Sequence, residues 1–149
     1  MITLRRVLRL ARHAFKTIRT HDQTSTDPKP ILADCRDLSQ LTPGYDAAAF
    51  CFALSYFDQD DAYQVLQQLH AVLKPGALLL LSTVAGDAAN SGVQTNAEGD
   101  SVVSFFRAES EIQHMVARAG FELLFSQRIA SPANASQISD DVVLLAKAS

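Results

Sequence analysis

Cysteine and histidine, the residue types most often used to bind metals, are few in this sequence and poorly spaced for that role. The two cysteines, Cys35 and Cys51, form no Cys-x-x-Cys pair, and the four histidines show no His-Glu-x-x-His spacing. Zinc sites are built from such clusters, so we expect no metal site. Two isolated cysteines also give no disulfide framework, which is typical of a reducing, cytoplasmic environment. We expect both thiols to be small, buried hydrophobic groups.

Acidic side chains gather at two places, where they could do chemistry or shape the backbone. Asp34 and Asp37 follow a short apolar run, and the segment 58–61, Asp-Gln-Asp-Asp, precedes apolar residues at helical spacing. Acids stabilise the N-terminus of a helix, so we interpret 58–61 as a helix start and not as a metal site. Asp37 fits a turn or cap residue. For Asp34, a binding role and a turn role both stay open.

Secondary structure must position these residues, and the hydrophobic pattern predicts strands and helices that alternate along the chain. The expected strands cover residues 31–33, 46–54, 77–83, 121–129 and 142–146. The expected helices cover about 3–19, 62–73 and 108–119. The almost unbroken apolar run at 46–54 is typical of a fully buried parallel strand, and the polar segment 85–101 is expected to be a long loop. The alternation indicates an α/β fold, mostly parallel, with a last antiparallel strand pair.

Composition and charge divide the chain into parts. The 149 residues, 48% of them hydrophobic and 19% charged, fit a single domain. Residues 1–20 hold six basic residues and no acid, whereas residues 21–149 hold the other seven basic residues and all 16 acids. We therefore expect a basic amphipathic helix at 1–20, a linker at 21–30, and an α/β core at 31–149.

The basic helix leaves several roles open. Its apolar stripe is wide enough to cover a sheet, which we favour, and contact with RNA or with a membrane surface is the alternative. The formal net charge of the whole chain is −3, so nucleic acid is not an expected partner. No run of about 18 apolar residues is present, so we expect no membrane span.

Five short motifs follow one another in a suggestive order. Tyr45-Asp46 opens an apolar run, Leu73-Lys74-Pro75-Gly76 leads into four leucines, and Ala119-Gly120-Phe121 joins a helix to the last strand pair. Upstream lie Ala33-Asp34-Cys35-Arg36-Asp37-Leu38 and Leu8-Arg9-Leu10-Ala11-Arg12. In order and spacing, these motifs resemble the later part of class I S-adenosylmethionine-dependent methyltransferases. None is specific alone.

The resemblance implies a Rossmann-like sheet of strand order 3-2-1-4-5-7-6, flanked by helices, and a cofactor, S-adenosylmethionine. It implies that Asp34 accepts a hydrogen bond from the adenine amine and that the backbone at Cys35 meets the adenine ring. Phe52, Ala53 and Leu54 would line the cofactor. Ser55 and Tyr56 would face the methyl acceptor, whose identity the resemblance leaves unknown. Tyr56 is equally well read as a packing aromatic.

One departure from the family pattern is prominent. The family's cofactor loop is rich in glycine, because glycine lets backbone approach the ligand closely, and no Gly-x-Gly occurs in this sequence. We therefore expect a truncated domain that begins after this loop and after the first two strands. The strand at 46–54 would then have an exposed edge, and such edges invite pairing. We expect the chain to cover this edge with its own N-terminal strand and helix, to pair there with a second copy or another chain, or to aggregate.

Two classes of function follow. The chain is either part of an S-adenosylmethionine-dependent methyltransferase, a transferase, or a non-catalytic methyltransferase-like interaction module.

Overall fold

The computed structural model describes residues 31–95, 99–130 and 140–149. These residues divide into two compact units, of which the larger holds residues 34–92, 103–130 and 140–149 and the smaller holds 31–33, 93–95 and 99–102. None of the helices within these ranges has the length and hydropathy to cross a membrane. The helix and linker expected at 1–30 lie outside the described residues.

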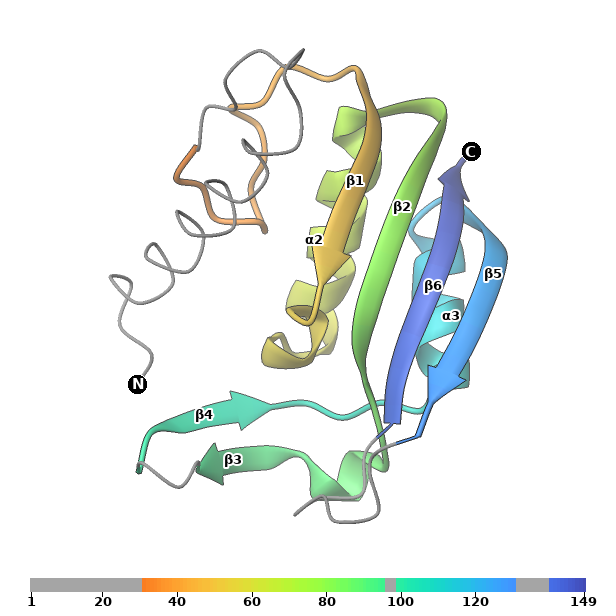
Figure 1. The fold of residues 1–149 in the computed structure, drawn as a ribbon. Helices are drawn as coiled ribbons and strands as arrows, with labels where there is room; N and C mark the ends of the chain where they lie inside the picture. The colour runs from red at the N-terminus through yellow and green to blue at the C-terminus, as the bar shows by residue number, and fades with distance from the viewer. Residues whose placement is uncertain (1–30, 96–98, 131–139) are drawn as a thin grey trace, which may run out of the picture. The chain divides into compact units, whose positions relative to one another are not determined.

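A four-stranded sheet of order β1-β2-β6-β5 forms the centre of the larger unit (Figure 1). Its strands are β1 (Tyr45–Cys51), β2 (Leu73–Ala85), β5 (Phe121–Ile129) and β6 (Asp140–Ala148). β1 and β2 are parallel, whereas β6 runs antiparallel to both of its neighbours. The expected α/β architecture and last antiparallel pair are confirmed. A mostly parallel sheet was wrong for the described strands, because only the connection through a helix between β1 and β2 gives a parallel pair.

The helix α2 (Gln59–Val72) makes that connection, and local chemistry fixes its ends. Asp58 is the N-cap, and its carboxylate accepts a hydrogen bond from the N–H of Asp61 at 2.9 Å. The acidic segment at 58–61 is thus a helix start, as expected. The helix ends where Leu73 becomes extended, two residues before Pro75, whose ring cannot continue a helix.

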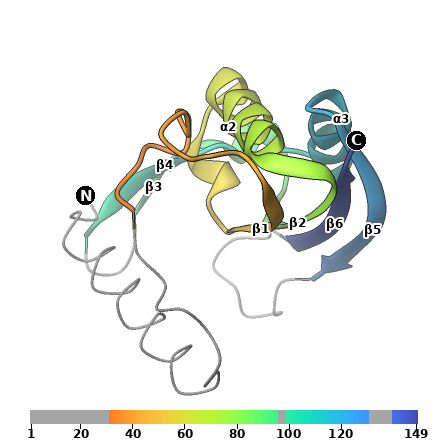
Figure 2. The same cartoon turned by 90° about the horizontal axis from the view of Figure 1, so that it is seen from above.

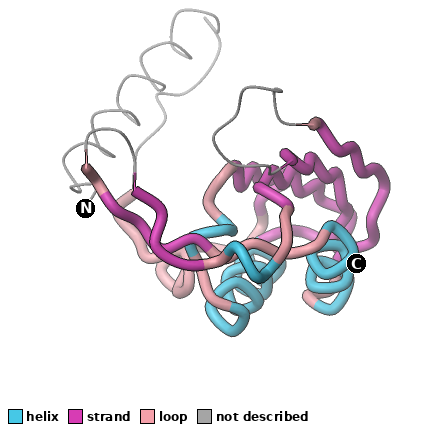
Figure 3. The backbone as a smooth tube through the Cα atoms, turned by 90° about the horizontal axis from the view of Figure 1, so that it is seen from below, coloured by secondary structure: helices cyan, strands magenta, loops and turns pink. Residues whose placement is uncertain are grey.

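Both α2 and α3 (Glu109–Arg118) cover the same face of the sheet (Figures 2 and 3). On that face the alternate leucines of β2, Leu79 and Leu81, are 0% and 1% exposed. They pack with apolar side chains of α2, α3 and β6 in one cluster. Their neighbours Leu78 and Leu80, which point to the other face, are each 41% exposed. The sheet therefore has one core face and one face that the described helices leave open.

The strand β1 differs from the fully buried strand expected at 46–54. Only Ala48 and Phe50 of its seven residues are partly buried, and the others are exposed. The reason is its position at the edge of a sheet covered on one side. Cys51 is exposed for the same reason, which corrects the expectation of two buried thiols. The strand ends at Cys51 because Phe52 adopts a positive φ of 54°.

Two further expectations are corrected outside the main sheet. Residues 31–33 form no strand, and Ile31 and Leu32 are 59% and 70% exposed, since three apolar residues without a partner strand bury too little to be ordered as one. The segment 85–101 is more than a loop. It contains a short 3₁₀ turn, η2 (Ala88–Asn90), and the strand β3 (Gly92–Thr95), which pairs with β4 (Ser101–Ser104).

Gly120 follows the end of α3 and leaves room for the ring of His70, which lies on α2. Its φ is +99°, and a Cβ built on it would lie 2.8 Å from Nε2 of His70. The His70 ring in turn meets the ring of Phe121 edge-on, with centroids 5.1 Å apart. The sequence prediction that glycine caps this helix is confirmed, and the close packing of the imidazole adds a second reason for it.

We expect Gly120→Ala to lower the free energy of unfolding by about 2–3 kcal/mol, because a left-handed backbone strain and a steric clash add. Gly76→Ala is the matched control, since Gly76 also has a positive φ (+82°) but an added methyl group would meet nothing within 4 Å. Urea denaturation of both variants measures the difference. Equal losses would mean that the His70 contact contributes nothing.

Candidate functional site

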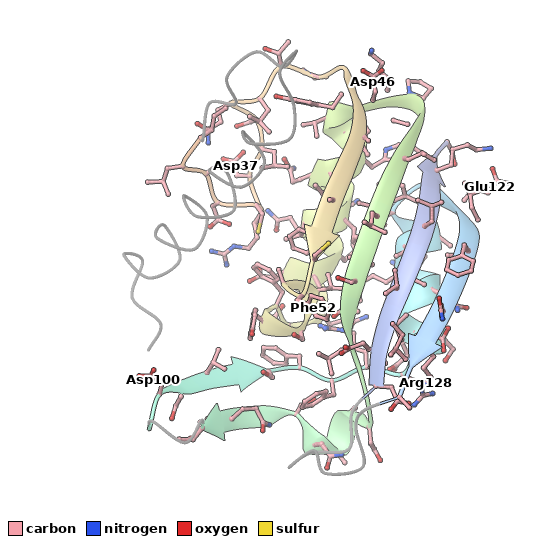
Figure 4. The ribbon with its side chains drawn as sticks, in the orientation of Figure 1. Asp37, Asp46, Phe52, Asp100, Glu122 and Arg128 are labelled. Carbon is pink, nitrogen blue, oxygen red and sulfur yellow. The ribbon has the colours of Figure 1, made fainter. Side chains whose placement is uncertain are left out.

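The carboxyl ends of the two parallel strands lie at the same edge of the sheet, where α/β folds bind ligands. Figure 4 shows Phe52 at this end of β1 and Asp46 at the other end. The N–H of Phe52 donates to the carbonyl of Ser82 at 2.7 Å, which fixes the end of β1 against β2. Segment 52–57 follows β1 and segment 86–91 follows β2. We take these two segments as the candidate site.

An ion-pair chain brings Asp34 to this edge. The guanidinium of Arg36 contacts the Asp34 carboxylate at 2.7 Å and the Asp61 carboxylate at 2.8 Å. The N–H of Arg36 also donates to Asp34 Oδ1 at 3.0 Å. Asp61 lies in the first turn of α2, directly after segment 52–57. The ion pairs therefore tie the stretch 34–38 to the first turn of α2, the helix that follows the stretch 52–56.

Two glutamines on successive turns of α2 hold the rest of the Asp34 loop. Gln64 Nε2 donates to the carbonyl of Arg36 at 2.8 Å, and Gln68 Oε1 accepts from the N–H of Leu38 at 2.9 Å. The Leu38 side chain is buried in the core. The loop thus rests on one side of α2, although it contains no regular secondary structure.

Electrostatics in this loop keep Asp34 ionised. Hydrogen bonds from Arg36 lower the pKa of the Asp34 carboxyl from 3.8 to about 2. Burial raises the pKa of the neighbouring Cys35 thiol, and the Asp34 charge raises it further. Cys35 is half-buried, so it is a protonated packing residue and not a reactive thiolate.

The five candidate residues after β1 have different environments. Phe52 and Tyr56 are 51% and 49% exposed, so both rings could meet a ligand. Ala53 is partly buried. Leu54 is 1% exposed and belongs to the hydrophobic core, so only its backbone could meet a ligand. Ser55 is buried, and its carbonyl accepts from the N–H of Phe105 at 2.7 Å.

Arg107 organises this segment, and no sequence pattern pointed to it. It is 6% exposed, and Nη2 donates to the carbonyl of Phe57 at 2.7 Å while Nη1 reaches the carbonyl of Leu54 at 3.4 Å. Nε donates to the side chain of Gln59 at 3.1 Å. The carbonyl of Arg107 accepts from the N–H of Gly86 at 3.0 Å, so this one residue ties the ends of β1 and β2 together. Burial lowers the pKa of the guanidinium.

A cavity of about 450 Å³, lined by both charged and apolar groups, lies beyond the end of β2. Four charged residues line it, and two of them, Arg128 and Asp140, form an ion pair with each other. The other charged residues are Asp87 and Glu109. Arg128 appears at this end of β5 in Figure 4. A second cavity, of about 340 Å³, is lined only by α2 and α3 and so belongs to the outer surface of the helices.

The described residues fit only part of S-adenosylmethionine. No Gly-x-Gly occurs in this sequence, so the described residues hold nothing like the glycine-rich loop that lets backbone contact the cofactor. Gly86 follows β2, but the ring of Phe106 lies 3.2 Å from where its Cβ would be. Asp34 and Cys35 are the residues that the family resemblance assigns to the adenine end, and Phe52 is one that it assigns to the lining of the cofactor. The described chain shows no matching set for the ribose and amino-acid ends.

We expect Arg107→Met to lower the free energy of unfolding by about 3 kcal/mol, because several buried carbonyl groups lose their donor. Arg118→Met is the control, because Arg118 is exposed on α3 with its guanidinium 4.8 Å from the Tyr63 ring, and we expect it to cost less than about 1 kcal/mol. Urea denaturation measures both. Similar small losses would show that the guanidinium does not hold the segment.

Asp34 should titrate near pH 2 in a carboxyl-carbon NMR titration. Since its pKa in the folded protein is below 3.8, the ion pair contributes stability that is full above that pH and is lost as pH falls toward 2. Arg36→Gln should move the midpoint back toward 3.8, because the main cause of the shift is removed. A midpoint near 3.8 in the unsubstituted protein would contradict the ion pair.

No protein-family model matches this sequence, and no curated protein matches it. Solved structures do resemble the fold. A methyltransferase from Methanosarcina mazei described as SAM-dependent superposes with a TM-score of 0.68 at 15% identity, covering 91% of this chain and 77% of that one. A 1,6-didemethyltoxoflavin N1-methyltransferase from Burkholderia thailandensis, solved with S-adenosylhomocysteine, gives 0.58 at 20% identity, covering 80% and 50%.

The [4+2]-cyclase SpnF gives a TM-score of 0.68 at 14% identity, covering 99% of this chain and 64% of that one. This chain thus spans between half and about three quarters of the length of these three structures. At such identities the likeness concerns the fold alone, and one neighbour with this fold is named for a different reaction. Together with the strand order of the sheet, these superpositions show that the chain has the fold of the class I S-adenosylmethionine-dependent methyltransferases.

Proposed function

We propose that this chain is a methyltransferase-type domain that supplies the adenine side and the acceptor side of an S-adenosylmethionine site. The observation that carries the proposal is the sheet: a parallel pair, β1-β2, followed by β6 inserted antiparallel between β2 and β5. The superpositions agree with that arrangement. As the sequence motifs and the fold agree, transferase chemistry is the function best supported.

In this proposal the exposed carboxylate of Asp34 accepts from the adenine amine, and the backbone at Cys35 lies along the ring. Phe52, Ala53 and the backbone of Leu54 line the cofactor, and Ser55 and Tyr56 face the acceptor. The cofactor supplies an activated methyl group when bound. The cavity beyond β2 is where an acceptor of unknown identity would enter. Its mixed charges favour a polar molecule.

A second function, that of a non-catalytic interaction module, is supported by a separate observation. The sequence contains no Gly-x-Gly, and the described residues do not complete the cofactor site. A methyltransferase-like domain without cofactor binding would act as an interaction module, and its outer sheet edge would be the contact surface. In either function we place the chain in the cytoplasm, because Cys51 is an exposed free thiol and a reducing compartment preserves such thiols.

Calorimetric titration of the chain with S-adenosylhomocysteine separates the two functions. This product of methyl transfer needs no acceptor to bind, so it tests the cofactor site alone. The methyltransferase proposal predicts one-to-one binding in the micromolar range, weakened at least tenfold by Asp34→Ala, because the hydrogen bond to a charged group is lost. Asp46→Ala is the matched control, since Asp46 lies at the opposite end of β1 (Figure 4).

Binding that Asp34→Ala weakens and Asp46→Ala does not would support the cofactor site. If the chain is folded by circular dichroism and no heat is measured at millimolar ligand, the methyltransferase proposal fails for this chain. The interaction module then becomes the better account. Equal weakening by both substitutions would remove Asp34 from the site.

A further inference from the structure

The outer edge of β1 is a strand edge that the described residues leave unpaired. β1 stands at the end of the strand order β1-β2-β6-β5, and no other described strand pairs with it. A free edge presents a row of N–H and C=O groups that another strand can bind. This edge is seven residues long, Tyr45–Cys51, which is ample for strand pairing.

The backbone of β1 fixes which residues face outward. The N–H of Phe52 donates to the Ser82 carbonyl of β2, and successive residues of a parallel strand turn these groups to opposite edges. Phe50 and Ala48 therefore also face β2. The N–H and C=O groups of Cys51, Ala49 and Ala47 face the open edge.

The features that normally prevent edge pairing are missing from residues 47–51 of this strand, whereas its pairing with β2 shifts register between Tyr45 and Ala47. Residues 47–51 contain no charged residue and no proline, and the ladder with β2 is regular over them. Natural edges are usually protected by lysine, proline, a bulge or a covering segment. The only charge of the strand is Asp46 near its start, and Lys74 neutralises it at 2.6 Å.

We propose that β1 pairs with β1 of a second copy of this chain, antiparallel and related by a two-fold axis at Ala48. In this orientation the outward N–H groups of one copy meet the outward C=O groups of the other, so the strand edge is self-complementary. Two-fold dimers are also the commonest assemblies. The axis at Ala48 pairs all seven residues of the strand. Ala48 then faces its own copy, and its small side chain allows the backbones to approach.

Overlap favours this register over its neighbours, because only a centre at Ala48 pairs all seven residues, and charge disfavours one further register. Centred on Ala48, Asp46 lies opposite Phe50 of the second copy, and Tyr45 lies opposite Cys51. A register centred on Asp46 would bring two carboxylates face to face, which is unfavourable. The exposed Tyr45 ring, 44% exposed in one chain, would cover the exposed Cys51 of the other.

This register predicts which cysteines can be linked. In a Cys35→Ser background, where Cys51 is the single thiol, Tyr45→Cys places two thiols opposite each other. Their Cα atoms would be about 5.5 Å apart, within the roughly 4.4–6.8 Å that a disulfide needs. Mild oxidation should then give a covalent dimer on a non-reducing gel, with the 45–51 link identified by mass spectrometry.

Ala47→Cys in the same background is the matched control. In this register position 47 lies opposite 49, so its thiol and Cys51 are diagonal neighbours about 7–8 Å apart, too far for ready oxidation. The Cys35→Ser parent should also stay unlinked. Linking in Ala47→Cys or in the parent, without linking in Tyr45→Cys, would overturn the proposed register.

Sedimentation equilibrium tests the edge itself. The unsubstituted chain should have twice the mass of one chain, and Ala49→Val should keep that mass because it keeps the outward N–H. Ala49→Pro removes that N–H while leaving the β2 side intact, so it should sediment as a folded monomer. A monomeric unsubstituted chain, or a dimer that Ala49→Pro leaves unchanged, would overturn the proposal. Neither result depends on cofactor binding.

Discussion

The pleat of β2 is the constraint on which the rest of this structure depends. Successive side chains of a strand point to opposite faces, so the four leucines at 78–81 cannot all be buried by helices on one side. Leu79 and Leu81 enter the core with α2 and α3, while Leu78 and Leu80 stay partly exposed. Since β2 pairs with β1 on one edge and β6 on the other, its pleat decides which residues of both neighbours face the core.

The candidate site depends on that sheet but is held by polar groups. Arg107 binds backbone carbonyls beyond β1 and, through its own carbonyl, the segment beyond β2. A guanidinium suits this task because its donors point in several fixed directions. The Arg36 ion pairs do the same for the Asp34 loop at the surface, where solvent makes each pair weaker. The buried contacts of Arg107 therefore set the geometry of the candidate site, and the exposed ion pairs of Arg36 contribute less to it.

Fold and function are supported to different degrees. The strand order and the superpositions place this chain among methyltransferase-type folds, yet the same fold occurs in a protein named as a cyclase. What distinguishes functions within a fold is the site. Here the residues proposed for the adenine side lie beside α2, whereas the sequence contains no Gly-x-Gly and the described strands leave the outer edge of β1 unpaired.

The sequence by itself determined the elements whose signals are local. The acids at 58–61, the glycine at 120 and the apolar stripes of α2 and α3 each act within a few residues, so those predictions were confirmed. Only the tertiary structure decided that β1 is exposed, that residues 31–33 form no strand, and that Arg107 holds the site. Burial depends on which distant segments cover a strand, and the partners of Arg107 lie about fifty residues away. No local pattern can encode contacts of that separation.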